Sequence, residues 1–283
     1  MLRRSRELFA DILRQTDLVL LALCAAASLF GVLMVASATR YMHTWRLVAV
    51  QSVALLLGVV LYLVISQIDL SDLCKYWKWI FLVGVVCILL LVTPLGIADN
   101  TGNRAWLDFP FLPVKVQPAE IVKLTLTLVL AKQLVWLKEN RNLSSIPSVL
   151  FLAAHLGVIF VLYYKVSSDM GSALVFLFIF TCMCFVGGVA LRWFLLGGLA
   201  GGLAFWAMWD LNKIPSYMKL RFQVLFDHSL DPQDTGWQQT RSLMALGSGK
   251  LTGQGLFRGT QTQSEYSSAL PNRHTDFIFT VIG

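Results

Sequence analysis

Seven apolar runs divide this sequence, and each is close to the length that an α-helix needs to cross a bilayer, about 20 residues. They cover residues 18–38, 47–65, 79–95, 119–137, 148–164, 171–190 and 193–209. Of the 283 residues, 57% are hydrophobic and 14% are charged, which is more apolar surface than a single soluble core buries. The sequence therefore predicts an all-α polytopic membrane protein in which residues 1–283 form one membrane domain.

The two ends of the apolar region need separate interpretation. The run 18–38 follows several arginines, as in a signal peptide, but it is longer than the apolar part of a signal peptide and further spans follow it. We interpret it as a signal anchor. Residues 210–275 form a long polar loop, and the apolar run 277–283 that follows has seven residues, where a spanning helix needs about 20. We expect seven transmembrane helices and the start of an eighth from residue 276, in a chain that is incomplete and inactive without further C-terminal spans.

Lysine and arginine residues in the short connections predict the orientation, because they are more frequent on the cytoplasmic side. One side carries nine of them, Arg3, Arg4, Arg6, Arg14, Lys75, Lys78, Lys138, Arg141 and Arg192, and the other carries five, Arg40, Arg46, Arg104, Lys115 and Lys165. The count places the N-terminus in the cytoplasm and the segments 99–118, 165–168 and 210–275 outside. The net charge of +7 is spread over loops rather than clustered, which favours membrane lipids over nucleic acid as partners.

Four ionisable side chains stand at the starts of apolar runs that this topology places on the outer side. Glu120 and Lys123 are three residues apart and can pair on one helix face. The pair either eases a helix end into the membrane or serves a function, as intramembrane charges often do. Asp169 and Asp276 each precede a run, where each is either a helix cap or a reactive acid held at the membrane surface. Their common side predicts a polar cluster open to the outer leaflet, suited to a lipid-linked substrate.

The remaining signals are weaker. Residues 247–251, GSGKL, resemble part of a phosphate-binding loop, but Met244 and Leu251 stand where that motif needs Gly and Ser or Thr, so we reject nucleotide binding. The glycines of this segment are expected to form tight turns near cations that suit phosphate, among them Arg273. His274 is either a solvated loop histidine or an acid–base group. The five cysteines fall mostly inside apolar runs and predict neither a disulfide framework nor a metal site.

Several blocks of this sequence resemble one known family. The blocks are GNRAWL at 102–107, QPAEIVKL at 117–124, DMG at 169–171, GWQQ at 236–239, SLMALGSG at 242–249, GQGL at 253–256, LP at 270–271 and HTDFIF at 274–279. They are similar to the outer loops and helix starts of the SEDS proteins (shape, elongation, division and sporulation), the family of RodA and FtsW, with RodA as the member resembled most. The resemblance extends over essentially the whole chain, and the block at 274–279 is its most specific part.

The resemblance implies a peptidoglycan glycosyltransferase of the bacterial cytoplasmic (inner) membrane. Such an enzyme polymerises lipid II into polyprenyl-pyrophosphate-linked glycan beside a class B penicillin-binding protein, its transpeptidase partner. By position, Asp276 matches the essential acid of the family, Glu120 and Lys123 match the paired residues of its fourth helix, and Asp169 matches the acid before its sixth.

This sequence departs from the family pattern at three places. Ser167 and Ser168 replace a Gln-Pro pair, and Ala119 replaces a Ser. The acidic pair that follows the start of the eighth helix in the family is absent from residues 1–283.

The chemistry of such an enzyme needs a base for the acceptor hydroxyl and cations for the departing pyrophosphate. We expect Asp276 to be the base, and a single displacement at the anomeric carbon would invert its configuration. The candidate phosphate ligands are Arg104, Lys115, Lys123 and Arg273, together with a divalent cation such as Mg²⁺ or Mn²⁺.

Two other classes of function stay open at this point. A flippase or transporter for a lipid-linked precursor also places polar residues inside a helical bundle, but it should carry them through to the inner leaflet. A non-enzymatic scaffold for cell-wall proteins would tolerate the loss of Asp276.

Overall fold

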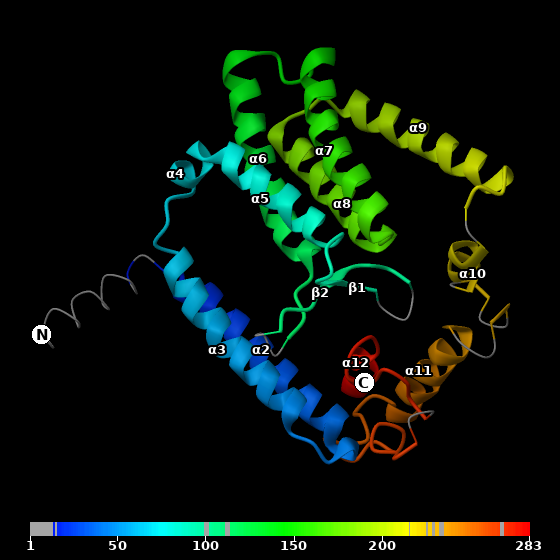
Figure 1. The fold of residues 1–283 in the computed structure, drawn as a ribbon. Coiled ribbons are helices and arrows are strands. Elements are labelled where there is room, and N and C mark those ends of the chain that lie inside the picture. Colours follow the sequence, from blue (N-terminus) through cyan, green and yellow to red (C-terminus); the bar gives the residue numbers. More distant parts are fainter. Residues whose placement is uncertain are drawn as a thin grey trace, which may run out of the picture. The chain divides into compact units, whose positions relative to one another are not determined.

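The computed structural model describes residues 14, 16–98, 102–110, 114–214, 216–224, 226–227, 230–231, 235–266 and 269–283 (Figure 1). The arginines at positions 3, 4 and 6, which contributed to the predicted orientation, lie outside these residues. The described chain is mostly helical and divides into two compact units. One is Asp69–Ala207, called here the bundle unit. The other joins the described residues up to Ile68 with Met208–Gly283 and is called here the hairpin unit.

The bundle unit is built around helix α6, Pro118–Asn140, which packs against α5 (Trp77–Leu90), α7 (Ile146–Ser167) and α8 (Met170–Gly187). Residues buried on α6 recur at helical spacing, and they are Pro118, Ala119, Val122, Thr125, Leu126, Val129, Leu130, Leu134 and Leu137. A Cβ at Gly84 on α5 would clash with the side chain of Thr125. The glycine therefore permits the close approach of α5 and α6.

The bundle unit also contains two short strands, a short helix and most of a further long helix. Strand β1 (Gly96–Ile97) pairs antiparallel with β2 (Trp106–Leu107), with Gly96 opposite Leu107. The chain then passes through a bridge between Leu107 and Val116 into the first turn of α6. Helix α4 (Leu70–Lys75) precedes α5, and α9 (Leu191–Asp210) follows α8.

The hairpin unit contains two long apolar helices, α2 (Leu18–Thr39) and α3 (Arg46–Ile65), joined by the short 3₁₀ helix η1 (Arg40–Met42). The helices run antiparallel, because the hydroxyl of Tyr62 near the end of α3 donates to the carbonyl of Asp17 at the start of α2. Asp17 also caps α2, since its carboxylate accepts from the N–H of Leu20.

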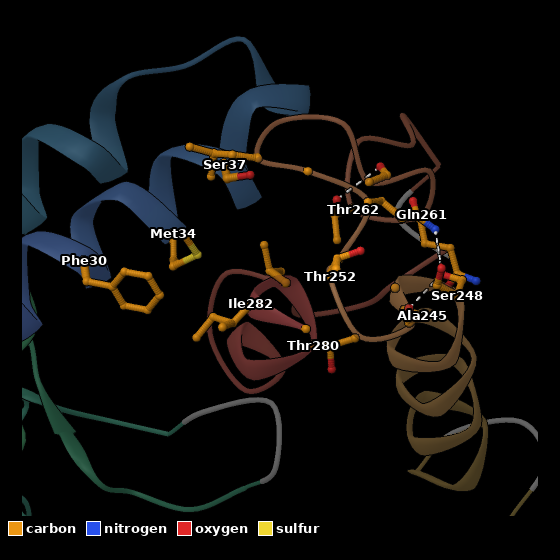
Figure 2. A pocket seen from close by; sticks show the side chains of 18 residues that line it. Phe30, Met34, Ser37, Ala245, Ser248, Thr252, Gln261, Thr262, Thr280 and Ile282 are labelled. Carbon is orange, nitrogen blue, oxygen red and sulfur yellow. Dashed lines mark hydrogen bonds between the residues drawn. The ribbon is translucent and has the colours of Figure 1, made fainter.

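The rest of the hairpin unit comes from residues after Met208. Helices α10 (Ser216–Val224) and α11 (Thr235–Gly249) lie in the segment that the sequence analysis described as a long polar loop. The terminal helix α12 (Ile278–Ile282) packs against α2 and α11. A cavity of about 200 Å³ is lined by residues of α2, α11, α12 and the loop between α11 and α12, and Figure 2 shows the side chains that line it. This segment is therefore a folded part of the hairpin unit.

Each of the seven expected spans overlaps an observed helix, and two of these helices differ informatively from the expected bounds. Helix α5 ends at Leu90 rather than residue 95, before Pro94 and the turn into β1, since proline cannot donate the hydrogen bond that a helix interior needs. Helix α6 runs longer than expected and carries five charged residues, Glu120, Lys123, Lys132, Lys138 and Glu139. In the described part of the chain, five helices are long and apolar enough to cross a membrane, namely α2, α3, α7, α8 and α9. The count of seven spans plus one stays a prediction.

Candidate active site

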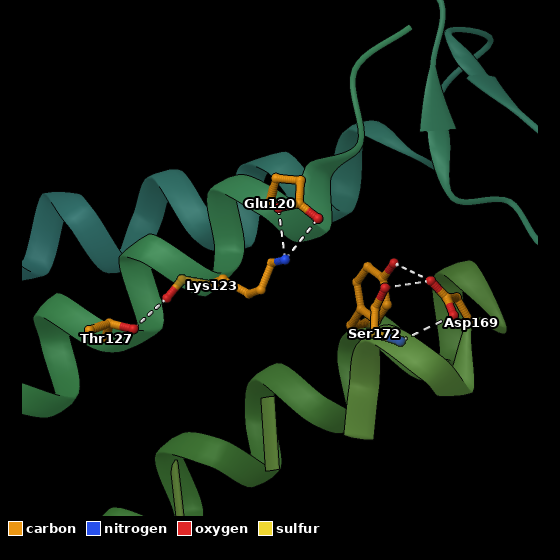
Figure 3. Close-up of polar contacts among 6 residues, drawn as sticks. Glu120, Lys123, Thr127, Asp169 and Ser172 are labelled. Carbon is orange, nitrogen blue, oxygen red and sulfur yellow. Dashed lines mark hydrogen bonds and ion pairs between the residues drawn. The ribbon is translucent and has the colours of Figure 1, made fainter. Parts of the chain in front are cut away.

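Glu120 and Lys123 lie in the first turn of α6, which opens with Pro118 at a position that favours proline. The Lys123 ammonium is 2.8 Å from Oε1 of Glu120 and 2.7 Å from Oε2, so both carboxylate oxygens contact the cation (Figure 3). The side chain of Glu120 is 62% exposed and that of Lys123 is 30% exposed. An ion pair this open contributes little to stability, roughly 0–1 kcal/mol. Its main effect is to fix the position of the ammonium.

Asp169 caps helix α8, as one of the two sequence interpretations expected. Its Oδ1 accepts the N–H of Ser172 at 3.2 Å, and its Oδ2 accepts the Ser172 hydroxyl at 2.6 Å. The hydroxyl of Tyr163, which is fully buried, donates to the same Oδ2 at 3.2 Å. Three donors therefore hold this half-buried carboxylate, and a capping residue is expected to accept such bonds.

Tyr163 was missed by the sequence analysis. It stands near the end of α7 among apolar residues, where its ring packs edge-on against Phe176 of α8. A buried tyrosine hydroxyl normally finds a hydrogen-bond partner. The sequence signal for this contact was an acid, Asp169, six residues after a tyrosine in an apolar run.

Arg104 and Lys115 lie in the segment that leads into α6. The Nε of Arg104 donates to the carbonyl of Gly96 at 3.0 Å, and its terminal nitrogen lies 3.4 Å from the carbonyl of Thr93. Its backbone N–H donates to the carbonyl of Ser167 at the end of α7, at 2.9 Å. Arg104 thus joins the strands to the end of α7 that precedes Asp169, and part of its donor capacity is used there. Lys115 is exposed.

The bundle unit therefore gathers Glu120, Lys123, Asp169 and Arg104 at one end, where α6 and α8 begin and α7 ends. That this end faces the outer side of the membrane, as the lysine and arginine count indicates, stays a prediction. Asp276 belongs to the hairpin unit and is described separately.

Asp276 does not cap the last helix. Helix α12 begins at Ile278 with Phe277 at the capping position, and no side chain caps it. The capping interpretation of Asp276 is therefore wrong for this structure. The carboxylate is exposed, and within the described residues it makes no recorded hydrogen bond or ion pair.

A tight turn presents the Asp276 carboxylate to solvent. The carbonyl of Asn272 accepts the N–H of Thr275 at 3.0 Å and the N–H of Phe277 at 3.2 Å. Asn272 itself has a φ of 48°, a left-handed conformation that asparagine tolerates. The backbone on both sides of Asp276 is thereby fixed while its side chain stays free.

Arg273 is 1% exposed and is the largest fully buried side chain among the described residues. Its guanidinium donates to the carbonyls of Gln261, Thr262 and Ser264 at 2.7–3.0 Å. Its central carbon lies 3.4 Å from the centre of the Tyr41 ring, a cation–π contact. The expectation that Arg273 is available for phosphate is wrong for this structure, because its guanidinium is buried and donates to the loop carbonyls instead.

The glycines after α11 form turns, as expected. Gly253 and Gly255 have φ values of 73° and 95°, which other residues rarely adopt. Residues 247 and 249 instead lie within α11, so the GSGK segment does not form a phosphate-binding loop. His274 is half-buried rather than solvated, and its Nδ1 lacks a hydrogen-bond partner among the described residues.

No group of three or more His, Cys, Asp or Glu side chains gathers as a metal site in the described part of the chain. A divalent cation that accompanies a pyrophosphate therefore stays a prediction.

Comparisons with known proteins agree on one family. The sequence profile of the FtsW/RodA/SpoVE family, described as cell cycle proteins, matches residues 15–283. The probable peptidoglycan glycosyltransferase FtsW of Geobacter metallireducens is 31% identical over 277 residues, which cover 94% of this chain and 70% of that protein. The peptidoglycan glycosyltransferase MrdB of Escherichia coli is 32% identical over 230 residues, 80% of this chain and 58% of MrdB. These identities do not rank a RodA-like relative above an FtsW-like one.

Solved structures support the same relationship. A chain from a structure on the structural coordination of polymerization and crosslinking by a peptidoglycan synthase complex superposes with a TM-score of 0.70 at 27% identity, covering 93% of this chain and 69% of that one. A crystal structure of a variant of the rod shape determining protein RodA of Thermus thermophilus gives a TM-score of 0.53 at 30% identity, with 65% and 58% covered.

Proposed function

Because this chain belongs to the FtsW/RodA/SpoVE family, we propose that it is a peptidoglycan glycosyltransferase that polymerises lipid II at the outer face of the bacterial cytoplasmic membrane. The family match over residues 15–283 is the observation that carries the activity. The free carboxylate of Asp276 is the observation that carries the proposed mechanism.

In this mechanism Asp276 is the general base. Its carboxylate accepts the proton of the acceptor sugar hydroxyl while the oxygen attacks the anomeric carbon of the second substrate. The bond between that carbon and the pyrophosphate oxygen breaks, and polyprenyl pyrophosphate leaves with the bonding electrons. One displacement inverts the anomeric carbon. A base must be accessible and must not already be saturated by donors, and Asp276 meets both conditions where Asp169 does not.

Charge on the departing pyrophosphate needs cationic groups. Lys123 suits this role because Glu120 fixes its ammonium at the open start of α6. Lys115 is exposed three residues before that helix. Arg104 retains part of its donor capacity after its contacts with Gly96 and Thr93. Asp169 acts in this scheme by fixing the start of α8 beside the pair.

The proposed partner is a class B penicillin-binding protein, which would cross-link the glycan as it is made. The support is the superposition with a chain from a peptidoglycan synthase complex. The proposed orientation has a cytoplasmic N-terminus, so that the starts of α6 and α8 and residue Asp276 face the side where lipid II is polymerised.

The test is to incubate the purified full-length protein, in detergent and with its transpeptidase partner, with fluorescently labelled lipid II. Detergent removes the bilayer, so a flippase has nothing to transport across, and a scaffold forms no glycosidic bonds. Glycan strands resolved on a gel are the expected result. Unchanged lipid II, under conditions in which a related polymerase is active, would contradict the proposal and favour one of the two alternatives.

A further inference from the structure

The turn between α2 and α3 carries an unusual group of side chains. Residues Leu18–Met42 and Arg46–Ile65 are both long and apolar enough to span a bilayer, so the turn between them lies at a membrane surface. The turn is closed tightly, because His43 adopts a φ of 50° and donates its N–H to the carbonyl of Arg40 at 3.1 Å. Arg40 and His43 are thereby held next to each other at this surface.

A cavity of about 490 Å³ opens beside this turn, a volume within the range of small-molecule sites. One part of its wall is apolar and comes from Ala36 on α2 and Val48 on α3. The other part is polar and includes Arg40, His43 and Thr44. The cavity therefore offers hydrocarbon contact along the helices and polar contact at the turn, the two halves of an amphipathic ligand.

The polar part of this cavity is suited to an anion. The guanidinium carbon of Arg40 lies 5.5 Å from the centre of the Phe257 ring, which also lines the cavity. This contact orients the cation but leaves its N–H donors free, since within the described residues no hydrogen bond or ion pair of that side chain is recorded. The described residues that line the cavity include no aspartate or glutamate, so no acid neutralises Arg40 there.

Trp45 marks the depth of the cavity in the membrane. Its side chain is 78% exposed and lines the same cavity, and exposed tryptophans are typical of the boundary between acyl chains and head groups. Lipid phosphates lie at that depth. The planar guanidinium of arginine matches the oxygen pairs of a phosphate.

We propose that this cavity binds the phosphate head group of an anionic membrane lipid, with Arg40 as the main phosphate ligand and the acyl chains lying along Ala36 and Val48. The site belongs to the hairpin unit alone, and it stands independently of the proposed glycosyltransferase activity. Arg46 provides a matched control, because it is an exposed cation at the start of α3 in the same turn and does not line the cavity.

The test measures binding of short-chain phosphatidylglycerol to the purified full-length protein, to Arg40→Gln and to Arg46→Gln, by native mass spectrometry. We expect affinity to fall about tenfold in Arg40→Gln, as the loss of a charge-assisted contact does, and to stay within about twofold in Arg46→Gln. Equal affinity of Arg40→Gln and the unchanged protein, or an equal fall in both variants, would overturn the proposal. Thermal unfolding without lipid shows whether the variants are folded.

Two ligand controls separate the sources of the phosphate. Short-chain diacylglycerol lacks phosphate and is expected to bind at least tenfold more weakly, whereas equal binding would rule out phosphate recognition. Glycerol 3-phosphate lacks acyl chains and is expected not to compete at the lipid's concentration. Effective competition would show that the cavity binds a free phosphate rather than a lipid, and it would overturn the assignment. If Arg40→Gln does not fold, Phe257→Leu keeps the charge while removing the ring beneath it, and affinity equal to that of the unchanged protein would then contradict the proposed site.

Discussion

Asp169 in the bundle unit and Asp276 in the hairpin unit stand at similar places in the sequence, each just before an apolar run, and the structure gives them different surroundings. Asp169 accepts hydrogen bonds from Ser172 and Tyr163 and caps α8. Asp276 lies in the turn before α12, is exposed and caps nothing. A carboxylate saturated by donors fixes local structure, whereas a free one can take up a proton. The comparison therefore separates a structural acid from a candidate base.

The two units also differ in where they place a cation close in sequence to a candidate acid. The bundle unit packs α6 against three helices and leaves the ion pair of Glu120 with Lys123 near the surface. The hairpin unit instead buries a cation, Arg273, whose hydrogen bonds hold the loop that leads to Asp276. The candidate base Asp276 thus follows a loop that is held by the hydrogen bonds of Arg273, whereas Lys123 stands on a helix.

The largest expected effect is all-or-none and concerns the side of the membrane. Cys74, between α3 and α5, is predicted to be cytoplasmic, and a cysteine introduced by Ser264→Cys is predicted to be outside. In intact protoplasts, a membrane-impermeant maleimide should modify a chain whose single cysteine is at 264 and spare one whose single cysteine is at 74. The reverse labelling would show that the orientation behind the proposed outer active site is wrong.

Loss of the buried guanidinium should strongly destabilise the loop of the hairpin unit. Arg273→Met leaves the carbonyls of Gln261, Thr262 and Ser264 without their donor. The bond to Thr262 is buried, and a buried acceptor left unpaired costs roughly 1–3 kcal/mol. We expect faster proteolysis within residues 250–275 and a lower thermal midpoint. Arg258→Met is the matched control, because Arg258 is exposed in the same loop. Similar protease resistance in both variants would show that Arg273 does not hold the loop.

A smaller effect is expected in the bundle unit from Tyr163→Phe. The change removes one buried hydroxyl and its bond to Asp169, which should lower stability by about 1 kcal/mol. Tyr164→Phe, at the neighbouring exposed position, should change stability by less than about 0.5 kcal/mol. Denaturation of the two variants in detergent measures the difference. Equal stability would show that the hydrogen bond from Tyr163 to Asp169 does not stabilise the bundle unit.

The smallest effect on stability is expected from Glu120→Gln. The pair is open to solvent, so its loss should cost about 0.5 kcal/mol. The polymerisation rate should fall clearly even though stability hardly changes, because Lys123 loses the partner that fixes its ammonium. Glu139→Gln, on the exposed last turn of α6, should leave both unchanged. Equal activity and stability in the Glu120 and Glu139 variants would show that the Glu120–Lys123 ion pair has no role in the reaction.

The sequence was sufficient for the features that depend on neighbouring residues. Apolar runs of membrane length predicted the long helices, and the spacing of Glu120 and Lys123 predicted their pair. An aspartate before a run gave the cap at Asp169 as one of two interpretations. Each of these depends on residues within one or two helical turns.

Features that depend on distant partners could not be predicted. Arg273 is buried against Tyr41, more than two hundred positions earlier, and nothing in either local sequence indicates that contact. The first turn of α12 starts two residues after Asp276 because the turn at Asn272 takes up the intervening backbone hydrogen bonds. Helices α10 and α11 were missed because their polar composition resembles that of a loop.

The most direct test of the account compares Asp276→Asn with Asp169→Asn, measuring lipid II polymerisation and thermal unfolding for each. Asparagine cannot accept the proton, so Asp276→Asn should reduce the polymerisation rate by at least about 100-fold while leaving the unfolding midpoint unchanged. Asparagine caps helices about as well as aspartate, so Asp169→Asn should keep much of its activity. Undiminished glycan synthesis by Asp276→Asn would contradict the assignment of Asp276 as the base.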